Sequence, residues 1–232
     1  MKEQTYPPSP FELADKAFAD ALPIPVRTID DDLVKVRLPG SRYDEIEEAV
    51  VRMYEKANAD IIPLPVFDIS NGLGYSLIPY RAFGPRIHDV LIKASMDAVT
   101  MRFNGSSRPA ILYNDRIIST RVNFSIMHEI AHNELGHKEP SQLAEIEANH
   151  FAAEALCPMA LLEHYHISET QKIIKIFNIS EDCASNRAKT MRNRTLRSLS
   201  ISPRCRRLRD NIIARFKFAA RFQRDLFGEL VF

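Results

Sequence analysis

The amino-acid sequence predicts an α+β fold in which two consecutive helices lie beside a small antiparallel sheet. Between residues 121 and 156, apolar residues recur at helical spacing, with a break only around residues 136–140. Between residues 74 and 113, short β-prone runs alternate with turn residues. The chain has 232 residues, 45% of them hydrophobic, so it is long enough to bury a core.

The first 59 residues are predicted to form an acidic, Pro-rich arm followed by a helix. Thirteen acidic residues stand against eight basic ones in residues 1–60. We expect a short helix at residues 11–22 and an amphipathic helix at residues 43–57, with Pro63 and Pro65 marking a boundary. The arm's prolines are Pro7, Pro8, Pro10, Pro23, Pro25 and Pro39, and the apolar side of the second helix is Ile46, Val50, Val51 and Tyr54.

The sheet is predicted from three β-prone runs. Residues 75–78 form one expected strand, and residues 98–103 and 110–113 form two more. The Asn-Gly-Ser-Ser run at 104–107 is a turn signal, so residues 98–113 are predicted to be a hairpin.

The next expected helix, residues 121–137, contains the motif His-Glu-Ile-Ala-His. Residues four apart lie on one face of a helix, so His128 and His132 can bind one metal ion together, with Glu129 beside them. Gly136 marks the expected end of this helix.

A second helix, at residues 141–156, places Glu145 and Asn149 on one face. Glu147 lies about 200° from Glu145 around the helix, so only one of the two can face the metal. We assign Glu145 as the third ligand and expect Glu147 to be solvent-exposed or salt-bridged. Two imidazoles and one carboxylate form a catalytic zinc site with an open position for water, and Glu129 would be the general base. The pattern therefore predicts one zinc ion per chain and a zinc-dependent hydrolase.

These residues resemble the ImmA/IrrE metallo-endopeptidases over roughly residues 60 to 192. Phe124 and Ser125 precede the His-Glu-Ile-Ala-His motif, and residues 145–158 read Glu-Ile-Glu-Ala-Asn-His-Phe-Ala-Ala-Glu-Ala-Leu-Cys-Pro. Asn123 and Cys157 depart from the family pattern, but neither is a proposed ligand. The resemblance implies a zincin-like catalytic domain and Glu145 as a ligand. It also implies Asn149 as the residue that orients a metal-binding histidine, and a substrate bound extended against a sheet edge.

Beyond Pro158 the sequence predicts two further helices. Ile167, Ser168 and Gln171 read as a capping box that opens a helix through residue 177, and a turn at 178–180 leads to a helix ending near 192. This resembles a helix-turn-helix, which we assign to the scaffold rather than to DNA reading.

The C-terminal segment is strongly basic. Between residues 186 and 224, thirteen Arg and Lys residues stand against Asp210 alone. Three alternatives stay open: a helix docked on the acidic N-terminal part, a nucleic-acid surface, or a recruiting site for an acidic partner. The predicted domains are thus the arm at 1–59, the peptidase domain at 60–195 and the basic helical segment at 196–232. The apolar side of that helix would be Ile212, Ile213, Phe216, Phe218, Phe222 and Leu226.

The cysteine content and the hydropathy of the chain indicate in which cellular compartment we expect the protein. Three cysteines without a C-x-x-C pair favour a reducing cytosol over a disulfide scaffold. The N-terminus has no apolar signal-like run, and the longest apolar stretch, 151–162, is too short to cross a membrane. We therefore expect a cytoplasmic protein without a membrane partner.

The functional prediction is a cytosolic zinc endopeptidase that makes a limited cut in a regulatory protein. The resemblance implies a helix-turn-helix transcriptional repressor, encoded separately, as the substrate. One alternative is a zinc-fold binding module that sequesters a regulator or nucleic acid without proteolysis, and another is hydrolysis of a small amide. Candidates for stabilising the oxyanion are Tyr113, Arg121, His137 and His150.

Overall fold

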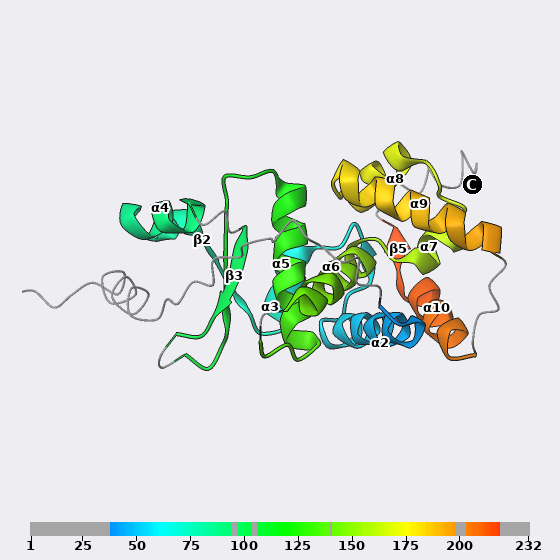
Figure 1. Ribbon diagram of the computed structural model, residues 1–232, viewed down its shortest axis with the longest axis horizontal. Coiled ribbons are helices and arrows are strands. Elements are labelled where there is room, and N and C mark those ends of the chain that lie inside the picture. The colour runs from blue at the N-terminus through cyan, green and yellow to red at the C-terminus, as the bar shows by residue number, and fades with distance from the viewer. Residues whose placement is uncertain (1–37, 94–96, 104–105, 140, 198–202, 219–232) are drawn as a thin grey trace, which may run out of the picture.

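The computed structural model describes residues 38–93, 97–103, 106–139, 141–197 and 203–218. A small sheet lies at one end, helix α5 (Ser119–Glu134) crosses the middle, and most other helices gather on the far side of α5 (Figure 1). The predicted α+β class is confirmed. The short helix expected at 11–22 lies outside the described residues, and the boundaries of the three domains stay a prediction.

The three-stranded sheet has the order β2-β4-β3. The expected hairpin is confirmed: β3 (Ala98–Met101) pairs antiparallel with β4 (Ala110–Tyr113). The expectation of a wholly antiparallel sheet was wrong, because β2 (Ser76–Pro79) pairs parallel with β4. The chain between β2 and β3 contains a 3-10 helix (Tyr80–Ala82) and helix α4 (Pro85–Lys93), neither of which was predicted. This long connection lets β2 take the free edge of β4 in the parallel sense.

Helices α5 and α6 (Gln142–Leu156) pack along each other and contribute much of the core. Val122, Ile126 and Ile130 of α5 are buried, as their helical spacing predicted. Gly136 has a φ of +71°, a left-handed conformation that a glycine adopts without cost, and α5 ends just before it. The Ser141 side chain accepts a hydrogen bond from the Ala144 N–H and so caps α6.

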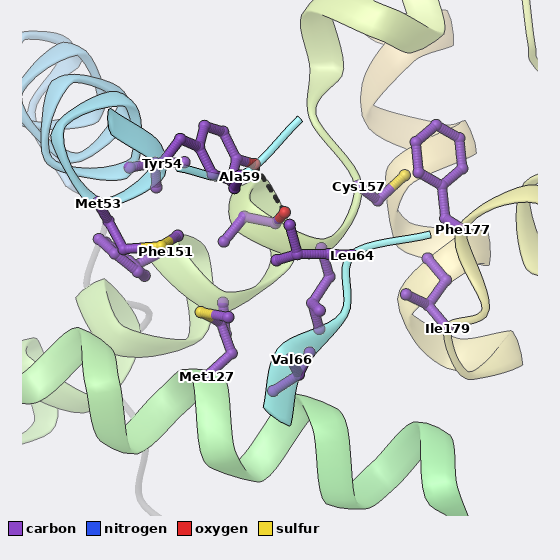
Figure 2. Packing of buried hydrophobic residues seen from close by; sticks show 14 of the residues in the cluster. Met53, Tyr54, Ala59, Leu64, Val66, Met127, Phe151, Cys157, Phe177 and Ile179 are labelled. Atoms are coloured by element: carbon purple, nitrogen blue, oxygen red, sulfur yellow. Dashed lines mark hydrogen bonds between the residues drawn. The ribbon is translucent and has the colours of Figure 1, made fainter. Parts of the chain in front are cut away.

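Helix α2 (Gly40–Lys56) lies beside α6. The predicted apolar side of α2 is buried, and the Tyr54 hydroxyl donates to the Ala155 carbonyl at 2.6 Å, the bond drawn dashed in Figure 2. Strand β1 (Ile61–Ile62) follows, then a cis Ile62–Pro63 bond and helix α3 (Val66–Gly72), which was not predicted. The side chains of Leu64 and Val66 enter the core between α2 and α5 (Figure 2).

Helices α7 (Met159–His164), α8 (Thr170–Phe177) and α9 (Glu181–Arg197) follow α6. The predicted capping box was wrong, since α8 begins after Glu169 without a side-chain cap. Ile167 is buried and its N–H bonds to the Leu162 carbonyl, so the segment completes the end of α7 instead. Asn178, with a φ of 53°, makes the expected turn between α8 and α9.

The basic helix expected near the C-terminus ends earlier than its apolar pattern indicated. Helix α10 (Pro203–Arg215) is followed by strand β5 (Lys217–Phe218), which pairs parallel with β1. Phe216, the residue after the helix, is buried and stacks edge-on against Tyr54 with ring centroids 4.7 Å apart. Phe222 and Leu226 lie outside the described residues.

Helix α10 is docked on the acidic α2. The Arg204 guanidinium pairs with Glu48, and Arg215 lies 3.8 Å from Glu55. For this helix the docking alternative is confirmed. No helix in the described ranges combines the length and apolar character needed to cross a membrane.

Candidate metal centre

The side chains of His128, His132 and Glu145 converge at one point between α5 and α6. The two histidine Nε2 atoms are 3.0 Å apart. The carboxylate oxygens of Glu145 lie 3.3 Å from Nε2 of His128 and 3.6 Å from Nε2 of His132. The three predicted ligands are therefore brought together, with one potential donor atom from each within 4.8 Å of the others.

Two local features produce this convergence. The four-residue spacing puts both histidines on the face of α5 that meets α6. Glu145 sits in the first turn of α6, which the Ser141 cap fixes in place. His128 is buried, whereas His132 and Glu145 are half-buried, so the point of convergence lies near the surface rather than deep in the core.

Asn149 supports His128 as the sequence predicted. Its side-chain oxygen lies 3.0 Å from Nδ1 of His128. Because an amide oxygen only accepts hydrogen bonds, the proton of a neutral His128 resides on Nδ1. Nε2 of His128 then presents a lone pair toward the convergence point.

His132 is supported by a second histidine that the sequence had suggested only as an oxyanion candidate. Nδ1 of His137 lies 2.9 Å from Nδ1 of His132, and Nε2 of His137 lies 2.9 Å from Glu147. Glu147 is buried and salt-bridged, which confirms one of its two predicted environments. Its partner is Arg42 of α2, which makes two hydrogen bonds to the carboxylate at 2.6 and 2.7 Å. No sequence signal identified Arg42, because it lies 105 positions from Glu147.

The donor set suits a divalent metal ion. Nε2 of His128 presents its lone pair 3.0 Å from Nε2 of His132, and the Glu145 carboxylate lies beside both nitrogens, so all three groups could bind one cation. Two imidazoles and one carboxylate are the ligands of catalytic zinc sites that keep an open position. The residues present therefore fit a metal ion, with His128, His132 and Glu145 as its protein ligands.

Glu129 points toward the sheet. Its Oε2 accepts hydrogen bonds from the Thr100 N–H at 2.8 Å and from the Thr100 hydroxyl at 3.0 Å. Thr100 belongs to β3, which lies at the edge of the sheet next to α5. The Glu129 carboxylate is thus held between helix α5 and the edge strand β3. Sequence reasoning missed Thr100, since nothing in a short alternating run indicates which helix it faces.

The other oxyanion candidates have identifiable contacts. Arg121 is ion-paired with Asp97 at 2.6 Å. Tyr113 packs edge-on against Phe67, and His150 packs edge-on against Tyr43. Burial raises the pKa of the Tyr113 hydroxyl, so this group stays protonated at neutral pH and can donate a hydrogen bond.

A second polar cluster lies at the other end of α6 and is closed. The Glu154 carboxylate pairs with Arg187 of α9 and accepts from the Met159 N–H at 2.9 Å, and Arg187 also donates to the Cys157 carbonyl at 2.9 Å. Burial alone would raise the pKa of Glu154, but the charge of Arg187 holds it below its ordinary value. Arg187, one of the thirteen basic residues near the C-terminus, is therefore part of the core.

Comparison with known families adds one match. Residues 86–189 match the Peptidase_M78 family, described as the IrrE N-terminal-like domain. The matched span contains α5 to α8, and with them every residue of the convergence point. It leaves out α2 and α10. A search of curated proteins found no match to the chain.

Proposed function

We propose that this chain, whose residues 86–189 match the IrrE N-terminal-like peptidase domain, is a zinc-dependent endopeptidase of the ImmA/IrrE type that acts in the cytoplasm. The observation that supports this most is the convergence of His128, His132 and Glu145 on one point. A purely structural zinc site has four protein ligands, whereas three ligands leave a position for water and substrate.

The chain's own residues would divide the work as follows. His128, His132 and Glu145 hold the zinc ion, which supplies Lewis acidity that activates a water molecule and polarises the scissile carbonyl. Glu129 accepts the proton of the attacking water and returns it to the leaving amine. Thr100 supports this role, because its two hydrogen bonds keep the Glu129 carboxylate in one orientation.

The proposed substrate is a protein segment in extended conformation. Within the described sheet β3 pairs with β4 on one side only, so an added strand would pair with its other edge, apart from the Thr100 N–H that already donates to Glu129. The edge also contains Thr100, which touches the proposed base. A peptide that pairs with β3 would therefore lie beside Glu129.

We propose that the natural substrate is a regulatory protein, a separately encoded helix-turn-helix repressor, cut at a limited number of bonds. This part of the proposal rests on the family resemblance. The three cysteines, all free, suit a reducing compartment in which such regulators act.

The test compares new protein N-termini by mass spectrometry in host cells that express the wild type or Glu129→Gln. The zinc content of both purified proteins is measured in parallel. A regulator cut only by the wild type, with one zinc per chain in both proteins, is the expected result. Equal zinc content with identical N-termini in the two cultures would contradict the proteolytic function.

A second candidate is the zinc-fold binding module that sequesters a regulator or nucleic acid. It is favoured by exposed basic side chains outside the metal centre, among them Lys189, Arg192, Arg206 and Arg207. The two functions differ in one result. If Glu129→Gln relieves repression as well as the wild type does, binding rather than cleavage is the activity.

A further inference from the structure

Four side chains connect the metal centre to helix α2. They run in order from His132 to His137, Glu147 and Arg42, with contacts of 2.9 Å, 2.9 Å and a paired 2.6 and 2.7 Å. The first three residues lie within the span matched to the family, and Arg42 lies outside it.

The chemistry of these groups fixes the direction of each hydrogen bond. Arg42 can only donate hydrogen bonds, so the Glu147 carboxylate accepts from it through both oxygens. Nε2 of His137 therefore donates to Glu147. In a neutral His137 ring whose Nε2 donates, Nδ1 has no proton and accepts from the Nδ1–H of His132.

The direction of these hydrogen bonds determines which nitrogen of His132 can bind a metal ion. A proton held on Nδ1 of His132 leaves the Nε2 lone pair directed at Glu145 and His128. A carboxylate at the far end of such a chain also increases the electron density on the ligand nitrogen. The chain thus selects the tautomer and the ring orientation that a metal ligand requires.

We propose that Arg42, Glu147 and His137 are positioning residues that hold His132 as a zinc ligand, and that α2 thereby completes the metal centre. This inference rests on the proposed zinc-binding function. The span matched to the family contains the three ligands, but one support for His132 would come from α2, which lies outside that span.

The two ligand histidines differ in a way that supports the proposal. His128 is oriented by Asn149, from the same helix pair that carries the ligands. His132 depends on a residue 90 positions upstream of it. The Arg42 side chain is only 30% exposed, and its Nη1 also donates to Glu45 at 2.6 Å. Helix α2 itself is anchored to α10 by the ion pair of Glu48 with Arg204. The guanidinium therefore has a fixed place from which to orient Glu147.

The experiment measures zinc affinity of the full-length protein by competition with a chromophoric chelator. Glu147→Gln should weaken zinc binding by about 10- to 100-fold, the range known for residues that support metal-binding histidines. Arg42→Met should weaken it by roughly 10-fold, at the lower end of that range. The matched control is Lys56→Met, which removes another cation of α2, one paired with Glu134 at 3.2 Å, and its affinity should equal that of the wild type.

Two further readouts separate positioning from general damage to the fold. Long-range ¹H–¹⁵N spectra of the histidine rings should show His132 protonated on Nδ1 and His137 on Nε2 in the zinc-loaded wild type. Arg42→Lys keeps the charge but not the paired hydrogen bonds, so its affinity should lie between those of Arg42→Met and the wild type.

Each outcome decides the matter. Wild-type affinity in both Arg42→Met and Glu147→Gln, or the reverse tautomers in the wild type, would overturn the inference while zinc binding itself stood. A wild type that binds no zinc would refute the proposed function and this inference together. Selective weakening in the two variants, with Lys56→Met unchanged, would establish the role of α2.

Discussion

The two ends of helix α6 carry the same kind of ion pair in different settings. Toward the N-terminal end, Glu147 meets Arg42 of α2, and toward the C-terminal end, Glu154 meets Arg187 of α9. Both carboxyl groups have a lowered pKa because of the adjacent arginine. In each pair the arginine comes from a remote part of the chain.

What surrounds the two pairs differs. Around Glu154, the Met159 N–H donates to the carboxylate and Arg187 donates to the Cys157 carbonyl, so these buried donors are all paired with oxygen acceptors inside the core. Beyond Glu147, two histidines lead to a half-buried point where three electron-pair donors meet. A closed set of donors and acceptors stabilises the fold, whereas a set of like donors that converge calls for a cation. We therefore expect the pair of Glu154 with Arg187 to stabilise the fold, and the pair of Glu147 with Arg42 to support metal binding.

The largest expected effect separates two glutamates at the metal end. Glu145→Gln should abolish zinc binding, because it removes a ligand, whereas Glu147→Gln should still bind zinc, although more weakly. Zinc content after exhaustive dialysis against a weak chelator measures the difference. Retention of zinc by Glu145→Gln together with its loss from Glu147→Gln would reverse the ligand assignment.

A change at the closed end should affect stability instead. Arg187→Met leaves the buried Glu154 charge unpaired, which is expected to lower the free energy of unfolding by about 3–5 kcal/mol. Urea unfolding of the metal-free protein measures this. Zinc affinity of the folded variant should equal that of the wild type, and a parallel loss of zinc would show that the two ends of α6 are not independent.

Acid should remove the contribution of the closed cluster. The pKa of Glu154 is lower in the folded protein than in the unfolded chain, so its ionised form stabilises the fold above the ordinary carboxyl pKa, and this stabilisation is lost as the pH falls through the folded-state pKa. The stability difference between the wild type and Glu154→Gln should therefore be constant near neutrality and shrink below about pH 4. Unfolding curves measured from pH 7 to pH 3 test this, and a difference that grew toward acid pH would contradict it.

The smallest expected effect concerns a thiol in the closed cluster. Burial raises the pKa of Cys157, so this thiol should resist alkylation in the native protein, while the partly exposed Cys205 reacts. Mass spectrometry after brief iodoacetamide treatment, with and without urea, gives the two rates. Arg187→Met should make Cys157 react faster, because the weakened cluster opens more often.

Local spacing, together with the family resemblance that singled out Glu145 and Asn149, predicted which residues meet at the candidate metal centre. His128 and His132, and likewise Glu145 and Asn149, are four residues apart, and a helix places such pairs on one face whatever surrounds it. The hairpin of β3 and β4 and the helices α2, α5 and α6 were predicted for the same reason, since their patterns repeat within a few residues. That these ligands hold zinc stays a proposal.

Contacts between distant segments could be found only in the tertiary structure. The β-prone run at residues 75–78 indicated a strand but not its parallel direction. Nothing near Arg42 indicated Glu147 as its partner, and nothing near Thr100 indicated Glu129. Helix α10 ends at Arg215 and the next residue, Phe216, packs against Tyr54, a long-range contact that a helical pattern continued through Leu226 did not indicate. The sequence by itself thus determined which residues share a face of one element, because that depends on backbone geometry. Folding decided which faces meet, because that depends on the packing of the whole core.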